Sequence, residues 1–238
     1  MPRDLLEELR SELRESADID KAAVSRRFFK TGPGEYGEGD KFLGIRVPEL
    51  RRLSKKFRSL SNTDTLYLLQ SEYHEERLLA LFIFVLKYKS VSASDRREIY
   101  DLYLKNIRFV NNWDLVDSSA EHIVGSFLND KAKEPLYKFA VSKSLWERRI
   151  AIMSTFHYIK RGSFDEPLKI ARMLLTDDED LIHKAVGWML REVGKRDLNV
   201  EKAFLNDYYN IMPRTMLRYA IERFPEVERK QYLKGGIS

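Results

Sequence analysis

Apolar residues recur along the chain at the spacing of helices. Leu5, Leu6 and Leu9 repeat at the three-to-four-residue interval of one helix face, and a second such series begins at Leu66. Apolar residues are denser from Leu78 to Leu86, as expected for a helix that is buried on most of its sides. No segment shows the strict alternation typical of a half-buried strand. The pattern therefore predicts an all-α protein.

A loose internal repeat groups the expected helices. Similar apolar stretches align on five anchors with steps of 36, 36, 35 and 34 residues, namely Arg77, Trp113, Arg149, Lys184 and Arg218. This period accommodates two helices and two short loops. It predicts a superhelical solenoid of HEAT-like repeats, formed by residues 1–238 as a single domain. Such stacks curve, and their concave side suits a rod-shaped partner.

Four of the five anchors are cations at the expected starts of helices. If the repeats superimpose, these cations lie in register along one side, as a surface that follows a phosphate backbone requires. The alternative is that they are ordinary solvated helix ends. A cation at a helix N-terminus opposes the helix dipole, and this cost favours a functional reason for the placement.

Composition narrows the class of protein. Its 238 residues include 42 Lys and Arg against 37 Asp and Glu, a mild bias toward polyanionic partners. The absence of cysteine excludes disulfide scaffolds, thiolate zinc sites and cysteine nucleophiles. No apolar run approaches the roughly 18 residues of a membrane span, and the chain opens without a signal peptide. We expect a cytoplasmic, nucleoid-associated protein with no membrane partner.

Several familiar motifs are absent or out of context. The segment from Gly32 to Gly37 fits G-x-G-x-x-G, but a helical pattern from Lys21 to Lys30 precedes it instead of a strand. We therefore interpret it as a glycine-rich loop between helices. The four histidines lack the spacing of metal ligands, and no Walker A or G-x-S-x-G sequence occurs. We expect no metal and no cofactor.

One repeat carries an unusual acid. Trp113 stands where the other repeats have a cation, and Asp117 follows it by four residues on the same helix face. Three of the four positions aligned with Asp117 are apolar, which predicts a partly buried carboxylate beside an indole. Such a carboxylate can stabilise a cation that develops during a reaction. The alternative is an ion pair with Arg149 of the next repeat.

Four segments resemble the DNA alkylation repair family. They are KFLGIRVPELR at residues 41–51, NWDLVD at 112–117, WERR at 146–149 and KAVGWMLRE at 184–192. With Phe28 and Arg223 as outer limits, they follow the order of the family's motifs. The resemblance implies a superhelix of HEAT-like repeats that holds duplex DNA in a concave basic groove. AlkD-type members release cationic N3- and N7-alkylated purines in base excision repair, without flipping the base into a pocket.

The resemblance also implies residue roles. Asp117 corresponds to the catalytic aspartate, Trp113 and Trp188 to the indoles that flank the sugar of the lesion, and Arg149 to the arginine that holds the backbone there. Arg191 is implied as a further phosphate contact. We also expect DNA contacts from Arg148 and Lys184, which belong to the cations at and near the repeat anchors, and from Arg46 and Phe28 near the groove. No exposed heptad or unpaired edge indicates an oligomer, so we expect a monomer. The implied enzyme needs no cofactor. It is monofunctional, since no motif places a lysine as a Schiff-base nucleophile.

Departures from the family pattern leave other functions open. Phe28 replaces a tyrosine of AlkD-type members, Arg46 a glutamine and Asn112 a tryptophan, and segment 31–40 is longer. One alternative is a non-catalytic HEAT-repeat protein that binds damaged or branched DNA. Another is a solenoid scaffold for proteins. The combination of Asp117 with both indoles favours the glycosylase, because a pure DNA binder has no need of a carboxylate facing a polyanion.

Overall fold

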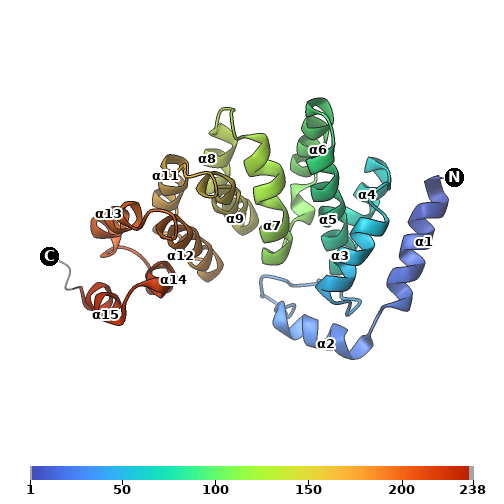
Figure 1. The fold of residues 1–238 in the computed structure, drawn as a ribbon. Helices are drawn as coiled ribbons and strands as arrows, with labels where there is room; N and C mark the ends of the chain where they lie inside the picture. Colours follow the sequence, from blue (N-terminus) through green and yellow to red (C-terminus); the bar gives the residue numbers. More distant parts are fainter. Residues whose placement is uncertain (1, 236–238) are drawn as a thin grey trace. The chain divides into compact units, whose positions relative to one another are not determined.

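The computed structural model describes residues 2–235, and most of them are helical. The predicted all-α class is confirmed: within residues 2–235 there is no strand, and the extended pairing consists of one isolated bridge between Lys41 and Tyr73. No described helix is both long enough and apolar enough to cross a bilayer. Figure 1 shows the helices in chain order.

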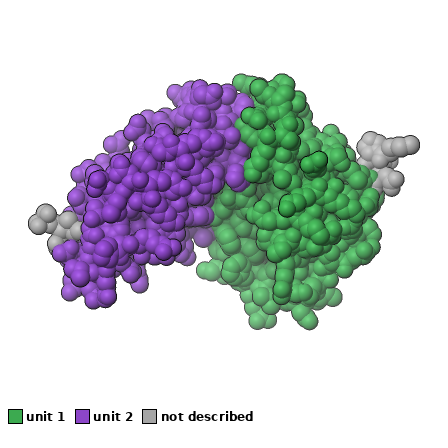
Figure 2. Space-filling view, viewed as in Figure 1, with its two compact units in different colours: residues 1–119 green, residues 120–238 purple. Residues whose placement is uncertain are grey.

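The chain divides into two compact units, residues 1–119 and 120–238, which are coloured separately in Figure 2. The division falls one residue before the end of helix α7 (Trp113–Ala120). The single domain expected from the sequence remains a prediction.

Unit 1 is built around a buried helix, α5 (His74–Ser90), which packs against α3 (Val47–Lys56), α4 (Asn62–Leu69) and α6 (Ala93–Lys105). Its apolar side chains from Leu78 to Val85 are all buried, as their density in the sequence predicts. Serine side chains begin two of the neighbouring helices, because Ser61 and Ser92 accept hydrogen bonds from the amides of Asp64 and Asp95. The remaining elements of unit 1 are α1 (Pro2–Glu15), α2 (Ile19–Phe28), a short 3-10 turn (Ile107–Phe109) and α7.

A glycine fixes how the segment before α3 crosses α2. Gly44 has φ +81°, and a Cβ there would lie 2.0 Å from the carbonyl oxygen of Asp18 and 2.6 Å from the amide nitrogen of Ala22. The amide of Gly44 donates to Oε1 of Glu75 at 2.8 Å. Only glycine combines this backbone conformation with such a close approach.

Unit 2 repeats a pair of helices. Elements α8 (Glu134–Ala140) and α9 (Leu145–Ser154) form the first pair, α11 (Asp165–Met173) and α12 (Asp180–Gly194) the second, and α13 (Leu198–Tyr208) and α14 (Arg214–Ala220) the third. The second helices begin at residues 145, 180 and 214, that is 35 and then 34 residues apart. These steps match the sequence repeat. Helix α12 packs against both α9 and α14.

Shorter elements complete unit 2. A π-helical turn (Glu121–Gly125) follows α7, α10 (Phe156–Ile159) follows α9, and a 3-10 turn (Ile221–Arg223) leads to α15 (Glu226–Lys234). The contact between α12 and α14 depends on Gly187. A Cβ at this position would lie 2.3 Å from the carbonyl oxygen of Met216 and 2.5 Å from the Cβ of Tyr219.

We expect Gly187→Ala to destabilise the protein by about 2 kcal/mol, because forcing a methyl group against backbone costs more than the roughly 1 kcal/mol gained in helix propensity. Chemical denaturation measures the change. Asp207→Ala, at an exposed position of α13, is the control and should leave the free energy of unfolding nearly unchanged. Equal stability of Gly187→Ala and the wild type would contradict the close approach of α12 and α14.

Candidate functional site

Aromatic side chains gather at the start of α7 in unit 1. The ring of Trp113, the first helical residue, stacks on Phe29 with centroids 5.4 Å apart and planes at 21°. Phe28 meets the same indole edge to face at 5.9 Å, and 63% of Phe28 is exposed. Two of the predicted site residues, Phe28 and Trp113, are therefore neighbours. An exposed phenyl ring beside an indole is a surface on which a base or a sugar can pack.

Asp117 lies one turn further along α7 and is half-buried. The pKa of the Tyr103 hydroxyl is raised mainly by burial, and the charge of Asp117 acts in the same direction. Counted from the helix start, Asp117 is the fifth residue, as Arg149, Lys184 and Arg218 are in theirs. The sequence repeat instead aligns Trp113 with these cations, because α7 begins at its anchor whereas those three helices begin four residues before theirs. By helix position, Asp117 replaces a cation.

The expected row of solvent-facing cations is wrong for two of its members. Arg77 is 4% exposed, pairs with Asp40 at 2.5 Å and donates to the carbonyl of Ser71 at 3.0 Å. Arg149 is 5% exposed and donates to the carbonyl of Leu181. Burial of a cation requires such partners, so these arginines first serve the packing of their units.

In unit 2, α12 carries three of the predicted residues, and two of them, Lys184 and Trp188, lie one turn apart. Trp188 is half-buried, with its ring 6.0 Å from that of Phe156, and its Nε1 donates to Oε1 of Glu192 at 3.3 Å. Lys184 pairs with Asp180 of the same helix at 2.6 Å. The indole of Trp188 therefore packs beside Phe156, and its N–H is hydrogen-bonded to Glu192.

Two predicted phosphate contacts in unit 2 are held by carboxylates. Arg148 donates to both carboxylate oxygens of Asp177, from Nε at 2.6 Å and from Nη2 at 3.3 Å. Arg191 pairs with Glu222 of the following 3-10 turn. A phosphate must replace these partners before either arginine can hold it. Arg46, exposed at the start of α3, has no ion pair with a described residue and needs no such exchange.

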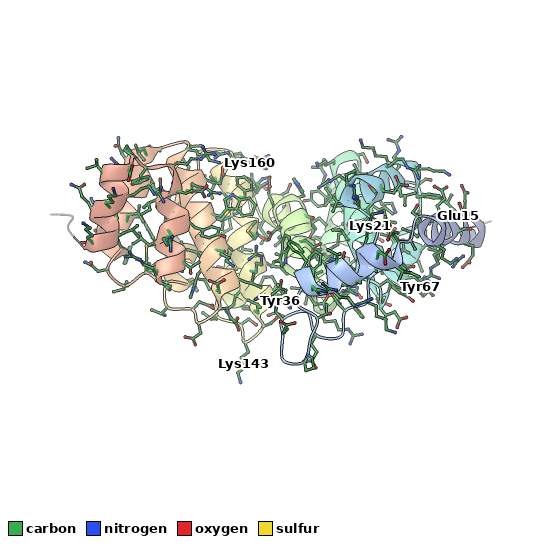
Figure 3. All side chains as sticks on the ribbon, turned by 90° about the horizontal axis from the view of Figure 1, so that it is seen from below. Glu15, Lys21, Tyr36, Tyr67, Lys143 and Lys160 are labelled. Carbon is green, nitrogen blue, oxygen red and sulfur yellow. The ribbon has the colours of Figure 1, made fainter. Side chains whose placement is uncertain are left out.

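Further cations lie beside Phe28 and were not singled out in the sequence. Arg26 and Arg27 on α2 are exposed and form no ion pair within the described part of the chain. Lys30 lies 6.0 Å from the ring centre of Tyr36, a residue of the glycine-rich loop. Figure 3 labels Tyr36 and, on α2, Lys21. The signal was present in the run RRFFK at residues 26–30, where cations enclose the aromatic pair.

Buried polar residues form a network behind Trp113, and the sequence did not indicate it. His74, the first residue of α5, binds Asp40 through Nδ1 at 3.0 Å and Asp114 through Nε2 at 2.8 Å. Asp40 ends the glycine-rich loop and also holds Arg77 and, at 3.4 Å, the side-chain amide of Asn112. No group of three or more His, Asp or Glu side chains is arranged to hold a metal ion in the described residues.

Both carboxylates accept a hydrogen bond from His74, so each ring nitrogen carries a proton and the imidazole is a cation. Burial by itself lowers the pKa of His74. The hydrogen bonds to Asp114 and Asp40 outweigh it and raise this pKa to about 9. Burial likewise opposes ionisation of Asp40, but the bonds to His74 and the charge of Arg77 hold the pKa of that carboxyl below its usual value.

This network predicts a loss of stability in alkali. The folded pKa of His74 is about 9 against 6.5 for the free side chain, so its contribution is complete below about pH 6.5 and is lost as the pH rises through 9. The loss amounts to about 3 kcal/mol at most. Denaturant titrations at successive pH values measure it, and His74→Gln should remove the dependence.

A second buried group, Glu201, also makes the stability depend on pH, and its effect must be distinguished from that of His74. Burial raises the pKa of Glu201 in unit 2 to about 8, so this carboxyl also destabilises the fold as the pH rises from about 4.5 to 8. The difference between the wild type and His74→Gln isolates the histidine. If the free energies of unfolding of the two proteins differ by the same amount from about pH 6.5 to 9, His74 is not charged in the folded protein.

Comparisons with known proteins agree with the sequence motifs. A predicted DNA alkylation repair enzyme from Enterococcus faecalis has a similar structure, with a TM-score of 0.70 and 18% identity over 89% of this chain and 98% of its own. AlkD2 from Streptococcus mutans gives a TM-score of 0.56 and 16% identity, covering 95% of this chain and 100% of its own. These likenesses show the fold.

A further structure, that of smu.31 from Streptococcus mutans UA159, gives a TM-score of 0.53 and 16% identity over 93% of this chain and 100% of its own. No curated protein matches the sequence. The model of the family described as "DNA alkylation repair enzyme" matches residues 9–224, which is nearly the whole chain. The chain therefore belongs to the DNA alkylation repair enzyme family.

Proposed function

We propose that the protein is a monofunctional DNA glycosylase that hydrolyses the N-glycosidic bond of cationic N3- or N7-alkylated purines in duplex DNA. The observation that carries this proposal is the start of α7. There a half-buried carboxylate, Asp117, follows by one turn an indole that stacks on Phe29 and adjoins the exposed ring of Phe28. Membership of a DNA alkylation repair family supports DNA as the partner.

The chemistry needs little more than a fixed negative charge. An alkylated purine is already cationic, so the C1′–N bond breaks with its electron pair moving to the purine, and the base leaves neutral without a general acid. The sugar becomes an oxocarbenium-like cation, and water adds to C1′ and gives up a proton. A carboxylate about 4 Å from that cation contributes about 4 kcal/mol at an effective dielectric constant near 20. Attraction in the ground state makes the net gain smaller.

The other predicted residues act as contacts in this proposal. The faces of Trp113 and Phe28 pack against the sugar and the charged lesion. Arg26, Arg27 and Arg46 bind phosphate, since all three are exposed and have no ion pair with a described residue. We also propose that Trp188 and Arg149 of unit 2 contact the sugar and the backbone. Arg191, Arg148 and Lys184 would bind phosphates, and each must first release the carboxylate that it now holds.

Release of methylated bases tests the proposal. We expect the wild type to release 7-methylguanine or 3-methyladenine from methylated duplex DNA, and Asp117→Asn to fold normally but lose roughly a hundredfold in rate, because the charge opposite the sugar cation is gone. Chromatography of the released bases measures the rate in single turnovers. Asp130→Asn makes the same change at an exposed site of unit 2 and should keep the wild-type rate.

The outcomes separate the competing functions. Full activity of Asp117→Asn would remove this residue from the reaction. DNA binding by the wild type without release of any base would instead support a non-catalytic protein for damaged or branched DNA. A failure to bind DNA at all would favour a scaffold for proteins.

A further inference from the structure

The ring of His74 joins three segments of unit 1 that are distant in sequence. It extends from the first turn of α5 to Asp40 at the end of the glycine-rich loop and to Asp114 in the first turn of α7. Asp114 is adjacent to Trp113 and three residues before Asp117. Fixing Asp114 therefore fixes the turn that presents both side chains.

A second connection between His74 and Trp113 runs through aromatic rings. The imidazole lies 4.7 Å from the ring centre of Phe42 and 4.7 Å from that of Phe29. Phe42 and Phe29 stack on each other at 5.1 Å, and Phe29 carries the indole of Trp113. Hydrogen bonds and stacked rings thus reach the start of α7 from the same histidine.

We propose that His74 is the positioning residue of the candidate site: as a cation that bridges Asp40 and Asp114, it holds the first turn of α7, with Trp113 and Asp117, against the end of the glycine-rich loop. The inference rests on the proposed function for its effect on catalysis. Its structural part concerns the bridge alone and can be tested without DNA.

The charged groups around the ring cannot replace His74 as the bridge between Asp40 and Asp114. Asp40 keeps Arg77 as a cationic partner when the histidine is neutral. The carboxylate of Asp114 has no other side-chain partner among the described residues, and its remaining bond is to the amide of Leu115 at 2.9 Å. The next acid on α5, Glu75, is occupied by the amides of Leu43, Gly44 and Ile45. A neutral imidazole has a single N–H, so it can donate to only one of the two carboxylates and the bridge opens.

Fluorine NMR of protein labelled with fluorotryptophan tests the bridge directly. The chain has three tryptophans, and Trp113→Phe assigns the signal of interest. We expect the Trp113 signal to shift with a midpoint near pH 9, where His74 loses its proton. The midpoint should move down in Asp114→Asn, which removes one of the two stabilising charges, and the step should vanish in His74→Gln.

Kinetics test the link to catalysis. We expect the wild type to release base roughly tenfold or more faster than His74→Gln at neutral pH, since small displacements of reacting groups are costly, and to bind DNA equally well. The ratio of the two rates at each pH cancels effects of pH on the substrate. It should approach one as the pH rises above 9, because the wild type then loses the bridge that the variant lacks.

Each result decides one question. A Trp113 signal that stays constant between about pH 7 and 10 in the folded wild type, or a rate ratio that does not change with pH, overturns the positioning role. If the wild type releases no base, the proposed function fails while the fluorine signal still decides whether the bridge exists. If His74→Gln does not fold, the titrations of the wild type and Asp114→Asn remain decisive.

Discussion

The organisation of unit 1 follows from one constraint: the first four residues of α5 are ionisable and buried. Charge without water needs a partner, so each of these side chains draws another segment onto the helix start. His74 and Arg77 hold the loop end at Asp40, His74 also holds α7, and Glu75 gathers three successive backbone amides before α3. Glu76 lies 3.8 Å from Arg10 of α1. The apolar remainder of α5 then forms the core.

Much of the fold could be predicted because helical periodicity and spacing are local. The all-α class, the glycine-rich loop and the 35-residue and 34-residue steps of unit 2 all follow from positions along the chain. The resemblance named Phe28 and Trp113 separately as site residues, but the contact between their rings was not predicted, since no rule of spacing connects two residues 85 positions apart. The roles given to Asp117, Arg149 and Trp188 stay predictions.

The burial and the partners of the site residues depend on packing, which cannot be predicted from residue type alone. Arg77 and Arg149 were interpreted as surface cations, yet both are buried, because a guanidinium is tolerated inside a unit once carboxylates or carbonyls satisfy it. The position of Asp117 within its helix was not predicted, because an alignment cannot tell where a helix begins. His74 looked ordinary in the sequence, since its two acids lie 34 and 40 residues away.

The internal pairing of cations has a consequence for the physics of DNA binding. A lysine or arginine that already holds a carboxylate brings no net charge to a phosphate, and the carboxylate that it abandons attracts a counterion from solution. Release of counterions, which is the entropic source of affinity for a polyelectrolyte, is therefore set by cations such as Arg26, Arg27 and Arg46 and not by the 42 in the sequence. Exposed cations without an ion pair to a described residue also occur in unit 2, for example Lys143 and Arg218, so both units would contribute to this driving force.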